Sequence, residues 1–167
     1  MQELRERIVK EGKVLPGNII KVDGFLNHRI DTQLMNHIAE EFGKHFNMDE
    51  VTMILTAEAS GIALSAIVAQ HFGKPMIFAK KAKSDNIEGG LYQSDIFSYT
   101  YKKKVTLLVS KEWLSADDKV LIIDDFMANG EAMRGLCDIV SAAGVNLKSL
   151  VIIESAEPGN IVFRDED

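Results

Sequence analysis

The chain is poor in cysteine and has no long apolar run. Cys137 is the single cysteine among 167 residues, which excludes an internal disulfide and a zinc site built on several thiolates. No apolar stretch approaches the roughly 18 residues that a membrane-spanning helix needs. The first twelve residues are charged throughout, unlike a signal peptide. We therefore expect a cytoplasmic protein with neither a signal peptide nor a membrane anchor.

An excess of positive charge is also missing. Nineteen Lys and Arg stand against 25 Asp and Glu, a formal net charge of -6. This balance argues against a protein whose main affinity is for nucleic acid or an acidic membrane surface. Hydrophobic residues make up 46% and charged residues 26% of the chain, close to the averages of folded proteins, so disorder is not expected. The length fits one domain spanning residues 1–167.

Apolar strands that alternate with helices predict an α/β fold with a mostly parallel sheet. The expected buried strands are 51–57, 75–80, 119–126 and 147–154, and the expected helices are 2–12, 31–46, 62–73 and 127–144. Between them, residues 14–31 are predicted to be irregular and residues 80–95 to form a long mobile loop. A hairpin is expected from strands 95–101 and 105–110.

The most informative stretch is VLIIDDFMANGEAMRG, residues 120–135. A buried strand delivers Asp124 and Asp125 to its carboxyl end, where open α/β sheets bind their ligands. The turn up to Gly130 then opens a helix whose first amide groups have no partner within the helix and can hold a phosphate. Carboxylates accept hydrogen bonds from ribose hydroxyls, so the pattern favours a phosphorylated sugar. In the alternative interpretation, Asp125 only caps the helix and Gly130 only allows the turn.

With this strand, diacid and Asn-Gly turn, the chain resembles the type I phosphoribosyltransferases. The segments KVLPGNIIKVDGFLNHRID and FAKKAKSDN also resemble the subgroup of this family that acts on xanthine. The resemblance covers most of residues 1–154. It implies a mostly parallel central sheet flanked by helices, a mobile loop hairpin and a small base-binding hood, to which residues 1–30 and 155–167 would contribute.

The resemblance implies a pentosyl transfer in purine salvage. The 5-phosphoribosyl group would pass from phosphoribosyl diphosphate, bound with Mg²⁺, to xanthine, giving xanthosine monophosphate and diphosphate. Positive charge that develops on the ribose would be stabilised by the nearby carboxylates. A homodimer is also implied. The alternatives are the same reaction on hypoxanthine, guanine or adenine, and a DNA-binding regulator that senses phosphoribosyl diphosphate, although the chain shows no basic DNA-binding unit.

Each part of the substrate has its expected partners. The resemblance implies Asp124 and Asp125 as catalytic residues at the ribose; Ala128, Asn129, Gly130, Glu131 and Ala132 at the 5'-phosphate; Ala59, Ser60 and either Lys81 or Lys83 at the diphosphate; and Ile20 and Asn27 at the base. Phe126, directly after the diacid, is placed to stack on the base. We expect the two acids to be exposed at the strand end, and burial inside the fold would count against this function. Residues 89–104 are the candidate lid that excludes water.

Several of these residues also have an ordinary structural interpretation. Ser60 would cap a helix, the lysines after residue 79 would form a solvated charge run, and Phe126 would pack beneath the loop. Asn27 would be a turn residue. Lys102, Lys103 and Lys104 are better explained as a hairpin turn kept soluble by charge. The four histidines have no spacing typical of metal ligands.

The chain departs from the family in two places. Glu131 puts an acid inside the phosphate loop, so its side chain is expected to point away from the phosphate. After Glu154 the family continues with a base-contacting lysine, a helix and a strand, whereas here SAEPGNIVF follows. That segment is either absent from this protein, which would weaken purine specificity, or present but not represented in the 167 residues. We favour the second explanation.

Overall fold

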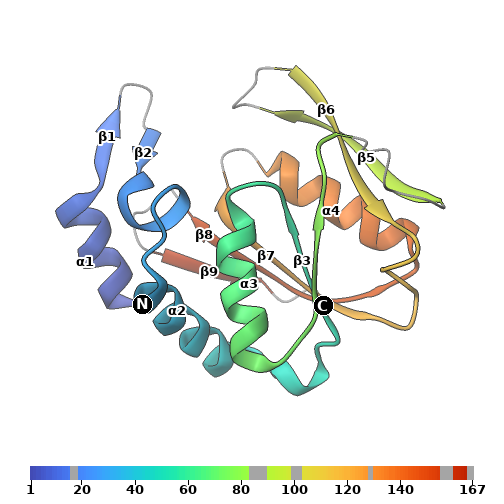
Figure 1. Cartoon of the computed structure of the whole chain (residues 1–167), viewed down its shortest axis with the longest axis horizontal. Coiled ribbons are helices and arrows are strands. Elements are labelled where there is room, and N and C mark those ends of the chain that lie inside the picture. Colours follow the sequence, from blue (N-terminus) through green and yellow to red (C-terminus); the bar gives the residue numbers. More distant parts are fainter. Residues whose placement is uncertain (16–18, 83–89, 99–102, 128–129, 155–159, 165–167) are drawn as a thin grey trace.

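The computed structural model describes residues 1–15, 19–82, 90–98, 103–127, 130–154 and 160–164, and after Lys148 it describes the backbone alone. A five-stranded sheet lies at the centre (Figure 1) in the order β4 (Met76–Ala79), β3 (Met53–Ala57), β7 (Lys119–Met127), β8 (Asn146–Glu154), β9 (Asn160–Arg164). The first four strands are parallel, and β9 pairs antiparallel with β8. The mostly parallel α/β sheet predicted from the sequence is therefore confirmed.

Strand β7 separates two hydrophobic cores because successive side chains point to opposite faces of a sheet. Leu121 and Ile123 pack with α1 (Gln2–Glu11), α2 (Thr32–His45) and α3 (Gly61–Phe72). Val120 and Ile122 pack with α4 (Glu131–Ala142) on the other face. All four side chains are fully buried. This explains the continuous apolar run in the sequence, which is typical of a strand covered on both faces.

The expected helices are present, and their ends have clear physical causes. Helix α2 begins after Asp31, whose Oδ1 accepts a hydrogen bond of 3.2 Å from the Leu34 N–H, the N-cap contact predicted for this residue. Helix α3 ends at Gly73, which has a left-handed φ of 62°, a conformation that costs glycine little. Between α2 and β3 lies a short 3₁₀ helix, η2 (Met48–Glu50).

Two segments differ from the sequence prediction. Residues 14–31 were expected to be irregular, but β1 (Lys13–Leu15) pairs with β2 (Ile19–Lys21), and a short π-helical segment, η1 (Asp23–Asn27), follows. Residues 80–95 were expected to form a loop, but β5 (Leu91–Ser98) already starts at Leu91 and pairs with β6 (Lys103–Ser110) over its whole length. Both errors arise because strand pairing depends on a partner elsewhere in the chain, which local composition does not reveal.

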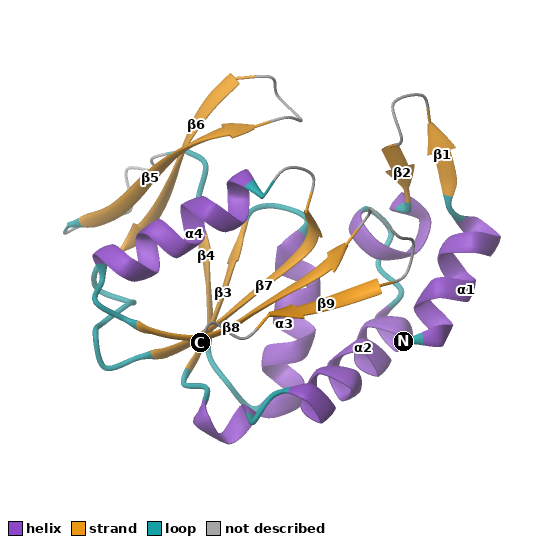
Figure 2. Ribbon diagram, turned by 180° about the vertical axis from the view of Figure 1, so that it is seen from behind, coloured by secondary structure: helices purple, strands orange, loops and turns teal. Residues whose placement is uncertain are grey.

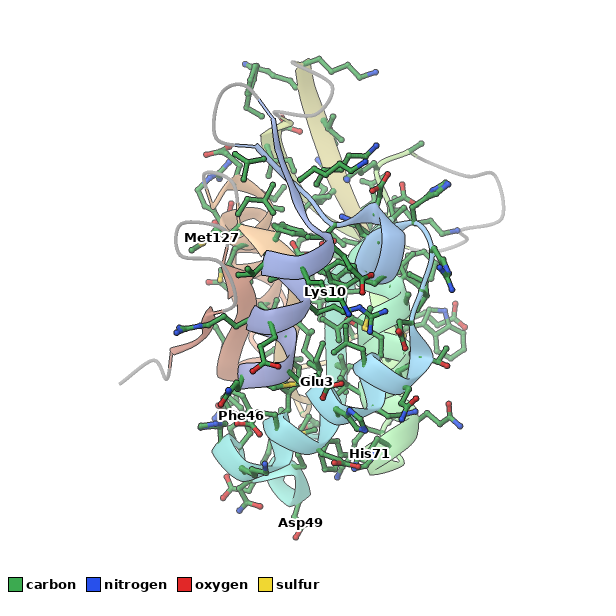
Figure 3. The ribbon with its side chains drawn as sticks, turned by 90° about the vertical axis from the view of Figure 1, so that its left-hand side faces the viewer. Glu3, Lys10, Phe46, Asp49, His71 and Met127 are labelled. Carbon is green, nitrogen blue, oxygen red and sulfur yellow. The ribbon has the colours of Figure 1, made fainter. Side chains whose placement is uncertain are left out.

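The two hairpins stand on either side of the carboxyl edge of the sheet (Figure 2). Figure 3 shows Met127, the last residue of β7, at the same end of the molecule as the β1–β2 hairpin, whereas Asp49 and His71 lie at the opposite end. The ends of β3 and β7 therefore open between the hairpins. Within the described part of the chain, we find no helix with the length and apolar character needed to cross a membrane.

Candidate active site

The diacid lies at the end of β7, as predicted, but it is not exposed. Asp124 is 7% and Asp125 3% exposed, so the expectation of open acids is wrong. The start of α3 covers them: the Ser60 hydroxyl donates a hydrogen bond of 2.8 Å to Asp125 Oδ1, and a Cβ at Gly61 would lie 2.8 Å from Asp124 Oδ1. The sequence shows each acid at a strand end but not the helix that lies over it.

The two carboxyl groups differ in their electrostatic state. Burial, followed by the negative charge of Asp125, raises the pKa of Asp124 well above its ordinary value, and Lys81 opposes this shift. Asp124 Oδ1 also accepts a hydrogen bond of 3.0 Å from the Asp125 N–H. Asp125 Oδ2 is buried and has no hydrogen-bond partner among the described residues. The site therefore combines a carboxyl group that favours its protonated form with a buried acceptor oxygen that has no partner among the described residues.

The turn between β3 and α3 is bonded to the backbone at the end of β4. The Glu58 carboxylate accepts a hydrogen bond from the Lys81 N–H, the Glu58 N–H donates to the Ala79 carbonyl at 3.0 Å, and the Glu58–Ala59 peptide bond is cis. Ser60 makes no capping hydrogen bond to α3, so its interpretation as a helix cap is wrong. Glu58 was not among the predicted site residues, although its place in the AEASG turn between a predicted strand and a predicted helix was a usable signal.

A pocket of about 670 Å³ lies between this turn and the β5–β6 hairpin. Glu58, Ala59 and Lys81 line one side, and the hairpin supplies Leu91, Gln93, Lys103, Lys104, Val105, Thr106 and Leu108. The interpretation of Lys103 and Lys104 as turn residues is therefore wrong, because they begin β6 and face the same pocket as Lys81. Lys83 lies outside the described residues. The clustered lysines suit a polyanion.

The expected phosphate loop is described only from Gly130 onward, because Ala128 and Asn129 lie outside the described residues. Gly130 has a φ of 73° and directly precedes α4. The Arg134 N–H donates to the Gly130 carbonyl at 2.8 Å, so the amide groups of residues 131–133 precede the first helical hydrogen bond and are free to meet an anion. Ala132 is half-buried against the hydrophobic core on the α4 face of the sheet, which includes Val120 and Ile122.

The Glu131 side chain is directed toward the β5–β6 hairpin, and its avoidance of the phosphate stays a prediction. Its Oε2 accepts hydrogen bonds from the Phe97 N–H at 3.0 Å and from Arg134 at 3.1 Å. The Arg134 guanidinium, followed by the Phe97 N–H, lowers the pKa of Glu131. The carboxylate is thus held charged and directed toward β5.

The three expected base-binding residues come from separate elements. Ile20 is in β2, Asn27 is the last residue of η1, and Phe126 is near the end of β7. All three are half-buried. Ile20 and Phe126 pack against the same hydrophobic core, so the structure brings these two to one side of the sheet and supports the packing interpretation of Phe126.

The described residues contain no cluster of three or more His, Cys, Asp or Glu that would hold a metal ion alone. Mg²⁺ is commonly bound by one or two carboxylates together with substrate phosphates. The partnerless Oδ2 of Asp125 fits that donor set. These residues therefore fit a Mg²⁺ ion that arrives with a phosphorylated ligand.

The fold is shared with solved phosphoribosyltransferases. Adenine phosphoribosyltransferase from Saccharomyces cerevisiae has a TM-score of 0.74 at 16% identity, covering 92% of this chain and 89% of that one. APRTase from Giardia lamblia has a TM-score of 0.72 at 22% identity, covering 89% and 82%. The phosphoribosyl transferase domain model matches residues 22–160, and the chain belongs to this family.

Curated relatives are more similar in sequence. Xanthine phosphoribosyltransferase from Lachnoclostridium phytofermentans is 45% identical over 193 residues, covering 99% of this chain and all of the relative. The protein of the same name from Bifidobacterium longum is 48% identical over 153 residues, covering 91% and 79%. The first alignment is longer than the 167 residues of this chain, so the relative has positions with no counterpart here. The expected junction at Ser155 lies outside the described residues.

Proposed function

We propose that this protein is an enzyme that transfers the 5-phosphoribosyl group of phosphoribosyl diphosphate to xanthine, giving xanthosine monophosphate and diphosphate in purine salvage. The observation that carries the proposal is the identity of 41–45% with three xanthine phosphoribosyltransferases over at least 98% of this chain and the whole of each relative. The site geometry supports it in one respect, because a diacid, a lysine-lined pocket and a helix start lie at one sheet edge. The burial of Asp124 and Asp125 was expected to count against this function, but it is outweighed by the identity with the three relatives along nearly the whole chain.

The diphosphate is assigned to the pocket between the 57–61 turn and the hairpin. Lys81, Lys103 and Lys104 supply positive charge there, and Ala59 and Ser60 contribute at the start of α3. As the bond to the sugar breaks, this charge stabilises the leaving diphosphate. Lys83 keeps its proposed role in the same subsite.

The ribose is assigned to the diacid. In this assignment, Asp125 accepts hydrogen bonds from ribose hydroxyls and stabilises positive charge developing on the ring. Asp124, whose pKa is raised by burial, holds a proton and donates it in a hydrogen bond. Mg²⁺ bound with the substrate would neutralise phosphate charge beside Asp125.

The remaining groups of the substrate lie on either side of the ribose in this assignment. The 5'-phosphate meets the free amides at the start of α4, at Gly130, Glu131 and Ala132, together with Ala128 and Asn129. Ile20 and Phe126 offer apolar surface to the base, and Asn27 offers both a donor and an acceptor to a purine edge that carries two carbonyls. Closure of residues 89–104 over the site stays a prediction.

The proposal includes a cytoplasmic homodimer. Trp113 is 63% exposed beside an apolar pocket of about 440 Å³ that Met76 and Phe78 also line. An exposed tryptophan next to an apolar hollow is typical of an interface residue. Sedimentation of the wild-type chain and of Trp113→Ser would test this assignment.

Nucleotide formation from phosphoribosyl diphosphate should be assayed in parallel with xanthine, guanine, hypoxanthine and adenine. We expect the highest kcat/KM with xanthine. A higher value with another purine would overturn the choice of base, an outcome favoured if the base-contacting lysine expected after Glu154 is absent. Inactivity with every purine, together with a gel shift of DNA, would replace the enzyme by the regulator.

A further inference from the structure

The β5–β6 hairpin is attached to the rest of the molecule in two described places. Lys80 and Leu108 exchange two backbone hydrogen bonds of 2.9 and 2.8 Å. Elsewhere the hairpin rests on α4, where a Cβ at Gly135 would lie 2.5 Å from Ile96 Cγ2 and 2.9 Å from Leu107 Cδ1. The close approach brings the backbone of β5 within reach of α4 side chains.

Arg134 lies at the centre of a polar network across this contact. Its Nη2 donates to the Asp95 carbonyl at 2.8 Å and to Glu131 Oε2 at 3.1 Å, and its Nη1 donates to Asp138 Oδ2 at 2.8 Å. The same carboxylates also bind β5: Glu131 accepts from the Phe97 N–H, and Asp138 accepts from the Ser94 hydroxyl at 2.7 Å. One planar guanidinium therefore holds two carboxylates and one backbone carbonyl in line with residues 94–97 of β5.

The strand held in this way also forms a wall of the lysine-lined pocket. Gln93 immediately precedes Ser94 and lines the pocket. Asp95 lies opposite Thr106 in the hairpin register, and Thr106 donates to Asp95 Oδ1 at 2.7 Å and lines the same pocket. A shift of β5 against α4 would therefore also move Lys103 and Lys104, which lie on the paired strand.

Helix α4 begins at the phosphate loop, so the network joins the two anion-binding parts of the site. We propose that Arg134 is a positioning residue that sets the hairpin wall, with its lysines, relative to the helix start at Glu131. The expected effect of Arg134 on the KM for phosphoribosyl diphosphate rests on the proposed function, whereas its role in positioning the hairpin does not. Because the side chains of Arg134 and Asp138 are each 49% exposed, the network contributes little to global stability, and its effect is alignment.

Arg134→Met keeps a long unbranched side chain and good helix propensity but removes all the donors. We expect the KM for phosphoribosyl diphosphate to rise about tenfold, since displaced binding groups lose alignment with the substrate, while the KM for xanthine and the melting temperature stay near wild type. In the substrate-free protein, amide exchange in β5 should be about tenfold faster. Arg134→Lys should be intermediate, because a point charge cannot make the planar set of contacts.

Lys44→Met is the matched control. Lys44 forms an exposed i,i+3 ion pair with Glu41 on α2, away from the hairpin, just as Arg134 pairs with Glu131 on α4. This variant should leave both KM values and β5 exchange unchanged. Unchanged β5 exchange in Arg134→Met would overturn the positioning role. If the wild type uses no purine, the proposed function fails separately, and exchange still decides whether Arg134 holds the hairpin.

Discussion

The starts of α3 and α4 both lie at the carboxyl edge of the sheet, but they differ in how closely the surrounding atoms pack against the backbone. The turn at 57–61 is crowded: Gly61 lies against Thr56 and Asp124, and Ser60 bonds to Asp125. At the start of α4, a Cβ at Gly130 would lie 3.7 Å from Met127 Sδ, an ordinary van der Waals distance, and glycine is favoured there by its φ of 73°. The 57–61 turn covers and orients the acids, whereas the start of α4 has first amide groups without a partner inside the helix.

The largest effect is expected when the charge of Asp125 is removed while its size and shape are kept. Asp125→Asn should lower kcat by about 10²–10³, the size of effect seen when a preorganised charge-stabilising group is removed. The melting temperature should stay the same or rise, because the variant retains an acceptor for Ser60 and removes a buried carboxylate oxygen that has no described partner. Steady-state kinetics and thermal unfolding on one preparation test this. Parallel losses of activity and melting temperature would contradict a ligand role.

Replacing glycine by alanine at Gly61 and at Gly130 compares how much free energy of unfolding each position loses when a methyl group is added. Gly61→Ala should destabilise the fold by about 1–3 kcal/mol, because the new Cβ overlaps Thr56 Oγ1 and presses on Asp124. Gly130→Ala should cost about 1–2 kcal/mol through left-handed backbone strain alone. Urea unfolding gives both values. Only Gly61→Ala should also change the pH dependence of stability, and equal pH profiles for the two variants would refute the difference.

The buried acid predicts a pH effect with a definite sign. Burial and the charge of Asp125 raise the pKa of Asp124, so between the unfolded and folded pKa values the native chain binds more protons. The free energy of unfolding therefore falls as pH rises through that window. Asp124→Asn removes this contribution, so the free energy of unfolding of the variant minus that of the wild type should increase as the pH goes from acid to neutral. Urea unfolding of both proteins at a series of pH values measures this quantity. A value that decreases as the pH rises would disprove the assignment.

The smallest effect is expected at the contact between Ser60 in the 57–61 turn and Asp125 in β7. Ser60→Ala removes one donor to Asp125 Oδ1, and a single hydrogen bond contributes about 0.5–1.5 kcal/mol net. We expect a several-fold rise in the KM for phosphoribosyl diphosphate and a small loss of stability. Ser60→Thr retains the hydroxyl and serves as the control. Equal kinetics for the two variants would remove Ser60 from the site.

Much of the fold could be predicted because its signals are local. The apolar run before Asp124 and the N-cap at Asp31 depend on neighbours in the sequence. The start of β5 at Leu91 and the place of Lys103 in β6 depend on pairing between the two strands, so the sequence analysis assigned them wrongly. Glu58 was missed for the same reason, since its partner Lys81 comes from the next strand connection.

By itself, the sequence determined the four parallel strands of the sheet but not β9. It also determined the diacid at the end of β7, the glycine before α4 and hence the family, because these are short-range patterns of polarity and backbone freedom. The tertiary structure alone decided that the acids are buried, that Ser60 bonds to Asp125 rather than capping α3, and that the hairpin lysines share a pocket with Lys81. Burial, the pKa of Asp124 and the grouping of charges depend on distances between segments far apart in the chain, and those distances exist only after folding.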